Sequence, residues 1–586
     1  MEPPSDRSYY TTSFTGEEPG DSILPLKWRC LDLEVLEVAA PDFPGLSLLR
    51  HIARVGASVG YKGDRSAVLN VPNGPSLKKY PRAWKAQVLK DLGLGRLVVP
   101  AEVGMVVVKN PALHVILKSH PEIRTLDDLI RLIYDATCHN HPDALNAKMP
   151  LEPPAPMHRY MTLHRLKRRL GWYLRKFGIF YMAISDAKAA FRRIRVRLAD
   201  WPLMGLDTGL PGLGLLLSTV LTFGLRSSPR SWVTLEDGII WALRAAGVDA
   251  GAYVDDAYVL AATYWQCLQG MKRCVHLHDA TGCPACRTKL ADGGFPDTKQ
   301  EYTGVIWSAM PPNLGSMYFS EKKIKKYTEQ LRRVATQRRL PATEVATVKG
   351  RLAHACTVYE QAKPWTACWH RVDTTNSTST ITVTRDMARC AKFVATVLTD
   401  RVGCNIVEPT PHRVHIYTDA STTTGFGGHM GPHHFYGEWT KDELLLNHIF
   451  LYELFTVVLA VVVFGDLIQG KRVTLHCDNQ AVVACVRANK APKVAGGDWL
   501  LQTLTRHLIR LHARLHIVWI GTKENICADD LSRGRVPATL PLLSYVHGTV
   551  VQTQTSWRRR TPWRARALVW DRWRRYSSSH VLSARG

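Results

Sequence analysis

The stretch AYVDDAYVL, residues 252–260, places two adjacent aspartates between two short apolar runs. Apolar residues on both sides of a polar turn predict two strands joined as a hairpin, with Asp255 and Asp256 at its tip. An isolated Asp-Asp pair is more often a simple polar turn. Upstream, however, YMAISDAKAAFRRIRV (181–196) delivers Asp186 at the end of another apolar strand. We therefore predict that these three carboxylates meet at one end of a sheet.

Such a cluster suits a reaction assisted by two metal ions. Carboxylate oxygens are the ligands that Mg²⁺ prefers, and aspartates on adjacent rigid strands hold them in place. Two ions about 3.5–4 Å apart can activate a 3′-hydroxyl and stabilise a leaving pyrophosphate. The predicted cofactor is Mg²⁺, with Mn²⁺ as an alternative ion.

A second acidic pattern lies in residues 413–533, where strand and helix signals alternate in a clear order. Three short strand patterns (413–419, 424–430, 433–439) precede a long apolar helix pattern at 444–465. A strand, two helices, a strand and a short helix follow, at 473–478, 479–489, 498–515, 515–520 and 525–533. This order predicts a mixed α/β domain.

Four carboxylates of this domain are candidates for a second metal site. Asp419 and Asp478 end strands, Asp529 opens the last short helix, and Glu453 lies inside the apolar helix. A glutamate in such a helix is costly unless its charge is compensated. Asp530 is the alternative to Asp529. The expected chemistry is hydrolysis of a phosphodiester by metal-activated water.

The bulk properties agree with a large protein that binds a polyanion. With 586 residues the chain exceeds one hydrophobic core, and its net charge of +26 favours nucleic acid as a partner. The 13 cysteines follow no repeating spacing, which indicates a reduced intracellular protein, in the cytoplasm, the nucleus or both. No apolar stretch reaches the length of a membrane span, so no membrane partner is expected.

The motifs around the first cluster resemble the reverse transcriptase family. YVDD (253–256) is similar to its polymerase signature, and Asp186 with Phe191 to its first metal-binding motif. LTFGLRSSPRSW (221–232) resembles its template- and nucleotide-contacting segment, VILKSHPEIRTLDDLIRLIYDAT (115–137) its fingers, and PDTKQEYTGVIWS (296–308) its palm lysine and primer grip. The resemblance implies that Phe191 is a steric gate against the 2′-hydroxyl. It implies substrate contacts from Lys118, Arg131, Phe191, Phe223, Gly224 and Lys299.

The second cluster resembles ribonuclease H. YTDAS, the Glu453 helix, DNQA and N-x-x-A-D-x-L-S-R carry the likeness, in the family's order. Together the two resemblances imply RNA-directed DNA synthesis with cleavage of the RNA strand of hybrids. The implied partners are an RNA template, a DNA primer, an RNA–DNA hybrid and dNTPs. FGLRSSP, DAKAAFR and ADDLSRG resemble DIRS-type retrotransposons, which implies an element-encoded tyrosine recombinase as a further partner.

The expected fold class is α/β and α+β multidomain, a right-hand polymerase followed by a ribonuclease H-like mixed α/β domain. The expected domains are a disordered N-terminus (1–30), fingers and palm (31–310), thumb-like helices (311–371), a linker or connection (372–412), a ribonuclease H-like domain (413–535) and a basic tail (536–586). In the thumb-like segment, 321–360 predicts two helices, and Pro341 opens the second.

Some features fit other interpretations. Thr222, Thr303 and Trp519 depart from the family patterns, so a decayed or domesticated protein that binds nucleic acid without catalysis stays an alternative. CVHLHDATGCPAC (274–286) offers zinc ligands, although its spacing is that of no known finger and ordinary thiols and imidazoles are the simpler interpretation. The tail WRRRTPWRARALVWDRWRRY (557–576) fits equally a nucleic-acid grip and a solvated basic segment.

Overall fold

The computed structural model describes residues 22–117, 130–138, 141–149, 162–287, 290–376, 378–400, 405–407, 413–440, 448–490, 494, 496–537, 545–546 and 549–550. The chain is a mixed α/β protein that divides into two compact units, Met1–Ser316 and Met317–Gly586. The fold class is therefore as predicted at this level. Most of the N-terminal segment and the basic tail at 557–576 lie outside the described residues.

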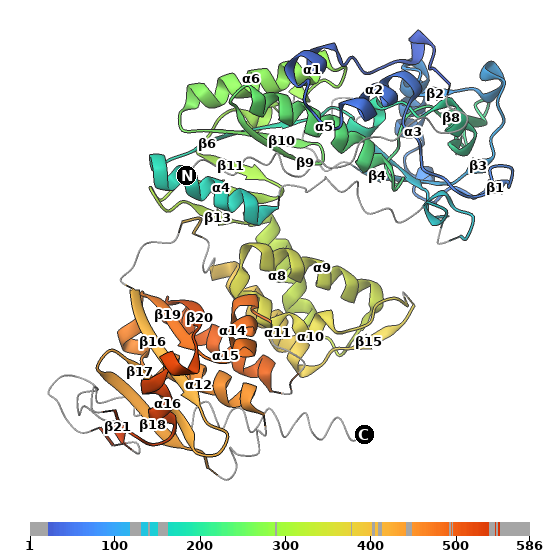
Figure 1. The fold of residues 1–586 in the computed structure, drawn as a ribbon. Coiled ribbons are helices and arrows are strands. Elements are labelled where there is room, and N and C mark those ends of the chain that lie inside the picture. The colour runs from blue at the N-terminus through green and yellow to red at the C-terminus, as the bar shows by residue number, and fades with distance from the viewer. Residues whose placement is uncertain are drawn as a thin grey trace. The chain divides into compact units, whose positions relative to one another are not determined.

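The first unit is built around a three-stranded sheet of β6 (Tyr181–Asp186), β10 (Asp256–Ala261) and β9 (Asp249–Tyr253). All neighbouring strands are antiparallel, and β9 and β10 form the predicted hairpin. Helices α5 (Ser228–Ala245) and α6 (Tyr264–Ala280) pack against this sheet (Figure 1). Their apolar side chains join a buried core that reaches the N-terminal helices.

Smaller elements surround this sheet. The other helices of the unit are η2 (Leu26–Trp28), α1 (Glu34–Ala39), α2 (Leu46–Val55), η3 (Leu77–Lys79), α3 (Pro81–Gly93), η4 (Pro100–Val103), η7 (Leu145–Ala147), α4 (Leu163–Phe177), η8 (Ala190–Arg193), η9 (Leu198–Leu203) and η10 (Leu290–Gly294). The other strands are β1 (Leu69–Asn70), β2 (Leu97–Val98), β3 (Lys109–Asn110), β4 (Ala112–Leu117), β5 (Ile130–Asp135), β7 (Gly205–Asp207), β8 (Leu215–Ser218), β11 (Lys299–Tyr302) and β12 (Val305–Ser308).

One prediction at the N-terminus is wrong for the part that is described. Residues 22–30 were expected to be disordered, but Leu24 is buried and its amide donates to the Arg54 carbonyl oxygen at 2.8 Å. The Trp28 ring packs edge-on against Trp201, with 5.4 Å between ring centroids. These few apolar residues pack against segments that are distant in the sequence. The local amino-acid composition does not indicate such contacts.

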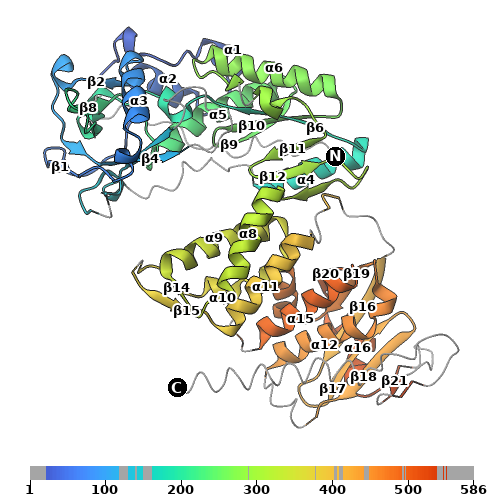
Figure 2. The ribbon, with the colours of Figure 1, turned by 180° about the vertical axis from the view of Figure 1, so that it is seen from behind.

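The second unit begins with a group of helices that follows β13 (Ser316–Tyr318). Helices α8 (Glu321–Val334) and α9 (Ala342–Val358) match the two predicted helices, and Pro341 caps the second. Helix α11 (Arg385–Asp400) packs along α8 (Figure 2). The same group contains β14 (Arg339–Pro341), η11 (Glu360–Trp365), α10 (Ala367–His370) and β15 (Thr380–Thr382).

The segment 372–412 is not a simple linker where it is described. It contains β15, which pairs with β14, and α11, which buries Met387, Cys390 and Val394. The apolar residues of α11 recur at helical spacing, and this periodicity outweighs the Ser/Thr-rich break before it. The exact residues at which the domains are predicted to begin and end stay a prediction.

The rest of the second unit is a five-stranded mixed sheet with the strand order β18-β17-β16-β19-β20. Strands β16 to β18 are antiparallel neighbours, whereas β16, β19 and β20 run parallel. The strands are β16 (Arg413–Ala420), β17 (Gly425–Met430), β18 (His433–Glu438), β19 (Arg472–Cys477) and β20 (Arg514–Trp519). The helices are α12 (Ile449–Val463), α13 (Gly465–Ile468), α14 (Gln480–Ala488), α15 (Gly497–Arg510), η13 (Thr522–Glu524) and α16 (Ile526–Ser532), and β21 (Tyr545–Val546) pairs with β22 (Thr549–Val550).

The predicted element order of 413–533 is confirmed. The apolar helix α12 packs on β16 and β17 and against α15, and nearly all of its side chains are buried. It is shorter than the predicted helix 444–465, whose first residues fall partly outside the described part. Helix α16 packs near β16 and β17, where Gly427 leaves room for it, because a Cβ there would lie 2.5 Å from the Leu531 Cβ.

Candidate active sites

The first carboxylate cluster lies where β6 meets the β9–β10 hairpin. Asp186 is the last residue of β6 and stands opposite Asp256, the first residue of β10. The Ala187 amide donates to the Asp255 carbonyl oxygen at 3.1 Å. Residues far apart in the sequence thus place three aspartates at one end of one sheet, as predicted. All three are partly exposed, so their carboxylates are accessible to a cation.

The hairpin tip is held in one conformation. Tyr253 and Asp256 are cross-strand partners, so Val254 and Asp255 form a two-residue turn. Val254 has φ of +60°, a conformation that a β-branched residue rarely adopts and that is found at functional sites. The Trp232 indole donates to the Val254 carbonyl oxygen at 2.9 Å, and the Tyr302 hydroxyl donates to that of Asp256 at 2.8 Å. These bonds hold the turn from two other elements.

Three of the predicted substrate-binding side chains form a contact series. The Arg131 guanidinium on β5 lies over the Phe223 ring, 5.1 Å from its centroid. The Phe223 ring in turn packs against Phe191, with 5.1 Å between centroids. Phe191 belongs to η8, five residues after Asp186, and is only 9% exposed. The series therefore joins β5 to the segment that follows the β6 aspartate.

Gly224 has a specific structural role beside this series. Its φ is +105°, and a Cβ added there would lie 1.8 Å from the Tyr134 carbonyl oxygen. The Tyr134 amide donates to the Phe223 carbonyl oxygen at 2.8 Å. The Asn146 side chain holds the same segment, because its amide donates to the Gly224 carbonyl oxygen at 2.8 Å. Asn146 belongs to no recognisable motif, so its role could not be predicted from the sequence.

The two predicted lysines are placed differently. Lys299 is exposed at the start of β11, whose last residue, Tyr302, reaches the hairpin tip. Lys118 lies outside the described residues. Between β11 and β12, Thr303 and Gly304 both have positive φ, at +50° and +73°, as in a type I′ turn. Threonine at this position thus keeps the hairpin geometry.

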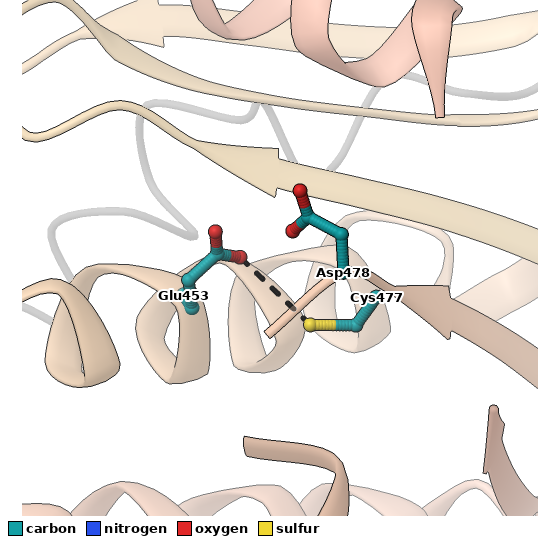
Figure 3. Close-up of side chains that lie close together, drawn as sticks. All are labelled: Glu453, Cys477 and Asp478. Carbon is teal, nitrogen blue, oxygen red and sulfur yellow. Dashed lines mark hydrogen bonds between the residues drawn. The ribbon is translucent and has the colours of Figure 1, made fainter. Parts of the chain in front are cut away.

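The second cluster gathers around the end of β19. Asp419 lies near the end of β16, Asp478 follows β19, and Glu453 lies on α12. The ligand atoms of Glu453, Cys477 and Asp478 all lie within 4.8 Å of one another (Figure 3). Asp419 and Glu453 are buried, with 5% and 3% of their surfaces exposed. The four predicted carboxylates come from four different elements.

Burial and mutual repulsion make the buried carboxylates hard to ionise in the absence of a cation. The pKa of Asp419 is raised to about 6, chiefly by burial and also by the charges of Asp478 and Asp529, against the Ser532 hydrogen bond and the Arg533 charge. Burial, followed by the charges of Asp419 and Asp478, raises the pKa of Glu453 well above its ordinary value. A divalent cation would relieve both effects, so the donor set fits Mg²⁺.

The arrangement distinguishes Asp529 from its neighbour. Asp529 acts on the Asp419 pKa, as stated above, and forms a bidentate pair with Arg533, at 2.8 Å from Nη2 and 3.0 Å from Nε. Asp530 instead pairs with Arg535 at 2.9 Å. The geometry thus agrees with the preference for Asp529 over Asp530.

Two residues at this site were missed. The Thr522 hydroxyl donates to Asp478 Oδ2 at 2.9 Å and orients that carboxylate. The Cys477 thiol donates to Glu453 Oε2 at 3.9 Å. Thr522 carries no motif, whereas Cys477 could have been noted as a thiol beside a candidate ligand. Trp519, noted as a departure, is 47% exposed and its indole donates to the Asp478 carbonyl oxygen at 3.0 Å.

The candidate zinc ligands of the Cys/His segment 274–286 do not all lie on one side of α6. His276 is exposed on α6, whereas Cys274 and His278 are buried on its other side. His278 Nε2 lies 3.5 Å from Glu236 Oε1 instead. Among the residues that the structure describes, three potential metal ligands lie within 4.8 Å of one another at Glu453, Cys477 and Asp478. The interpretation as ordinary thiols and imidazoles therefore fits better.

Comparisons with known proteins give structural matches alone. No protein-family model matches the chain, and no curated protein matches it. The chain is structurally similar to the foamy viral protease-reverse transcriptase dRH in complex with double-stranded DNA, with TM-score 0.44, 14% identity and coverage of 87% of this chain and 84% of that chain. It is also similar to the foamy viral protease-reverse transcriptase in complex with dsDNA, with TM-score 0.43, 15% identity and coverage of 86% of this chain and 98% of that chain. For the same enzyme in complex with RNA/DNA hybrid, the TM-score is 0.42 and the identity 14%, with coverage of 91% of this chain and 66% of that chain.

In the described part of the chain, no helix combines the length and apolarity of a membrane span.

Proposed function

We propose that this protein is an RNA-directed DNA polymerase with ribonuclease H activity. The observation that carries the proposal is the presence of two separate carboxylate clusters, one in each compact unit. The first lies at a strained hairpin tip, and the second around a buried glutamate. The motifs FGLRSSP, DAKAAFR and ADDLSRG support a DIRS-type retrotransposon as its source, with a tyrosine recombinase as partner. The 13 cysteines without a repeating spacing support a location in the cytoplasm, the nucleus or both.

In the polymerase site, Asp186, Asp255 and Asp256 would hold Mg²⁺. Bound there, the ions would supply activation of the primer 3′-hydroxyl and charge stabilisation of the leaving pyrophosphate. The Arg131 guanidinium, stacked on Phe223, offers a charge for the triphosphate. Phe191, packed against the same ring, offers a rigid wall beside the sugar, which supports its proposed selection of deoxynucleotides. Lys299 and Lys118 are further proposed substrate contacts.

In the nuclease site, Asp419, Glu453, Asp478 and Asp529 would hold Mg²⁺. The ions would supply an activated water and neutralise charge on the scissile phosphate. Thr522 orients the Asp478 carboxylate, and Arg533 forms an ion pair with Asp529. The proposed substrate is the RNA strand of an RNA–DNA hybrid.

Two single substitutions separate the activities. We expect Asp255→Asn to abolish dNTP incorporation on a primed RNA template and to leave hybrid cleavage intact. We expect Glu453→Gln to do the reverse. Each variant is assayed for Mg²⁺-dependent primer extension and for cleavage of a labelled hybrid, so each serves as a folding control for the other.

A matched pair tests the nuclease assignment at a finer level. Asp529→Asn should abolish hybrid cleavage, whereas Asp530→Asn, which removes the neighbouring carboxylate that pairs with Arg535, should retain it. Loss of both activities from each single change would contradict the two-site assignment. Hybrid binding by the unaltered protein without any Mg²⁺-dependent extension or cleavage would favour the decayed, non-catalytic alternative.

A further inference from the structure

A thiol lies inside the second carboxylate cluster. Cys477 Sγ is 3.9 Å from Glu453 Oε2, and Figure 3 shows both side chains and Asp478 turned toward one another. The potential ligand atoms of the three residues all lie within 4.8 Å of one another. Closing such a set onto one ion requires only small side-chain movements, because metal–ligand bonds of about 2.0–2.3 Å bring ligand atoms to within about 4 Å.

The strand geometry explains why the thiol points into the site. Side chains of β19 alternate, and Val473, Leu475 and Cys477 are the ones that are buried on the side of α12. Asp478 comes directly after the strand end, and the Thr522 hydroxyl orients its carboxylate, one oxygen of which lies within 4.8 Å of the Glu453 and Cys477 ligand atoms. Cys477 is fully buried and lies within the apolar core cluster, so the thiol cannot rotate into solvent.

The donor types matter because they select metal ions. Four carboxylates alone suit a hard ion such as Mg²⁺, which binds oxygen ligands. A thiolate with carboxylates suits softer ions, and Zn²⁺ takes three protein ligands and a water in tetrahedral geometry. A thiol beside the carboxylates of a Mg²⁺ site therefore gives the same side chains a second preference, for a softer ion, which competes with their preference for Mg²⁺.

We infer that Glu453, Cys477 and Asp478 form a site for a thiophilic divalent ion, Zn²⁺ or Cd²⁺, which excludes the hard ion from the nuclease centre. On binding, the metal–sulfur bond forms, the S–H bond breaks and its proton passes to solvent, so the thiol becomes a thiolate ligand. The ion engages the Glu453 and Asp478 carboxylates that would otherwise hold Mg²⁺. The part of this inference that concerns inhibition rests on the proposed nuclease function, whereas the part that concerns binding does not.

Cd²⁺ titration of the full-length protein tests the site through a readout that is independent of activity. A thiolate bound to Cd²⁺ absorbs in the ultraviolet by charge transfer, and we expect one equivalent of this absorption to be lost in Cys477→Ser. The matched control is Cys485→Ser, which removes another buried thiol of the same core and should keep the absorption. Glu453→Gln keeps the thiol but removes a charged ligand, and it should weaken Cd²⁺ binding about tenfold or more.

The outcomes separate the site from the proposed function. Equal Cd²⁺ absorption and affinity in Cys477→Ser and Cys485→Ser would overturn the inference, as would unchanged affinity in Glu453→Gln. If the Cys477-dependent absorption is present but the unaltered protein does not cleave hybrid with Mg²⁺, the metal site stands and the nuclease proposal fails. If hybrid cleavage is present and micromolar Zn²⁺ does not suppress it, the inhibitory role is wrong.

Discussion

At the scale of single residues, the backbone around Gly224 determines that this motif position is a glycine. Alanine there would combine a positive φ with a Cβ 1.8 Å from the Tyr134 carbonyl oxygen. We predict that Gly224→Ala lowers the free energy of unfolding of the first unit by more than about 1 kcal/mol and lowers primer extension, because the Phe223 segment must shift. Urea denaturation measures the first effect. The matched control is Gly93→Ala at the end of α3, where a Cβ meets nothing within 4 Å, and equal midpoints for both variants would contradict the argument.

A second residue-scale prediction concerns His434 on β18, whose side chain is fully buried. Burial lowers the pKa of this imidazole below 6.5. Because the folded pKa is depressed, the unfolded chain takes up the proton first, and stability is lost as the pH falls from about 6.5 through the folded pKa.

His434→Phe should therefore lose less stability between pH 7.5 and pH 5 than the unaltered protein. Denaturant midpoints of both proteins at the two pH values measure the difference. Asp419, whose pKa is about 6, also titrates in this window. The raised pKa values of Asp419 and Glu453 act in the opposite sense to that of His434, because they favour folding as the pH falls. They are present in both proteins and cancel in the comparison. An identical loss in both proteins would show that His434 is not the group responsible.

At the scale of elements, α12 combines a fully apolar helix with one buried acid. Glu453 costs stability because its charge is desolvated and repelled by Asp419 and Asp478. We predict that Glu453→Gln raises the metal-free stability of the second unit by about 1–2 kcal/mol, as substitutions that relieve a strained active site commonly do. The same variant should lose most of the stabilisation that Mg²⁺ confers, because binding to the folded state alone stabilises it by mass action.

Thermal melting with EDTA and with millimolar Mg²⁺ tests this expectation for α12. Asp530→Asn is the control, since its carboxylate pairs with Arg535 outside the cluster. If Glu453→Gln melts at a lower temperature in EDTA than the unaltered protein, the glutamate stabilises the metal-free fold, and the prediction is wrong.

At the scale of the whole molecule, the net charge of +26 would govern association with the proposed nucleic-acid substrate. Phosphate contacts release counterions, so we predict that affinity for an RNA–DNA hybrid falls steeply with salt. If the protein makes 6–10 phosphate contacts, the loss between 50 and 200 mM salt is about 10³–10⁵-fold. Fluorescence anisotropy over this range gives the slope of log K against log salt. A slope near zero would contradict a binding mode dominated by phosphates.

Much of the architecture could be predicted from the sequence because it depends on local patterns. The alternating runs at 413–419 and 473–478 and the apolar helix around Glu453 give strands and a helix in any tertiary setting, since periodicity acts over a few residues. The same holds for the turn that carries Asp255 and Asp256, and for the helices that Pro341 separates. The acidic residues that end these elements were found in this way.

The tertiary structure alone decided which segments that are distant in the chain contact one another. The sequence did not indicate that Arg131 lies over Phe223, that Thr522 orients Asp478, that α11 packs on α8, or that the Cys477 thiol faces Glu453. Each depends on how whole elements pack, and packing is set by the summed burial of many side chains and not by any local pattern. The sequence determined which acidic residues are candidates for the chemistry, and only the packing determined which side chains surround them.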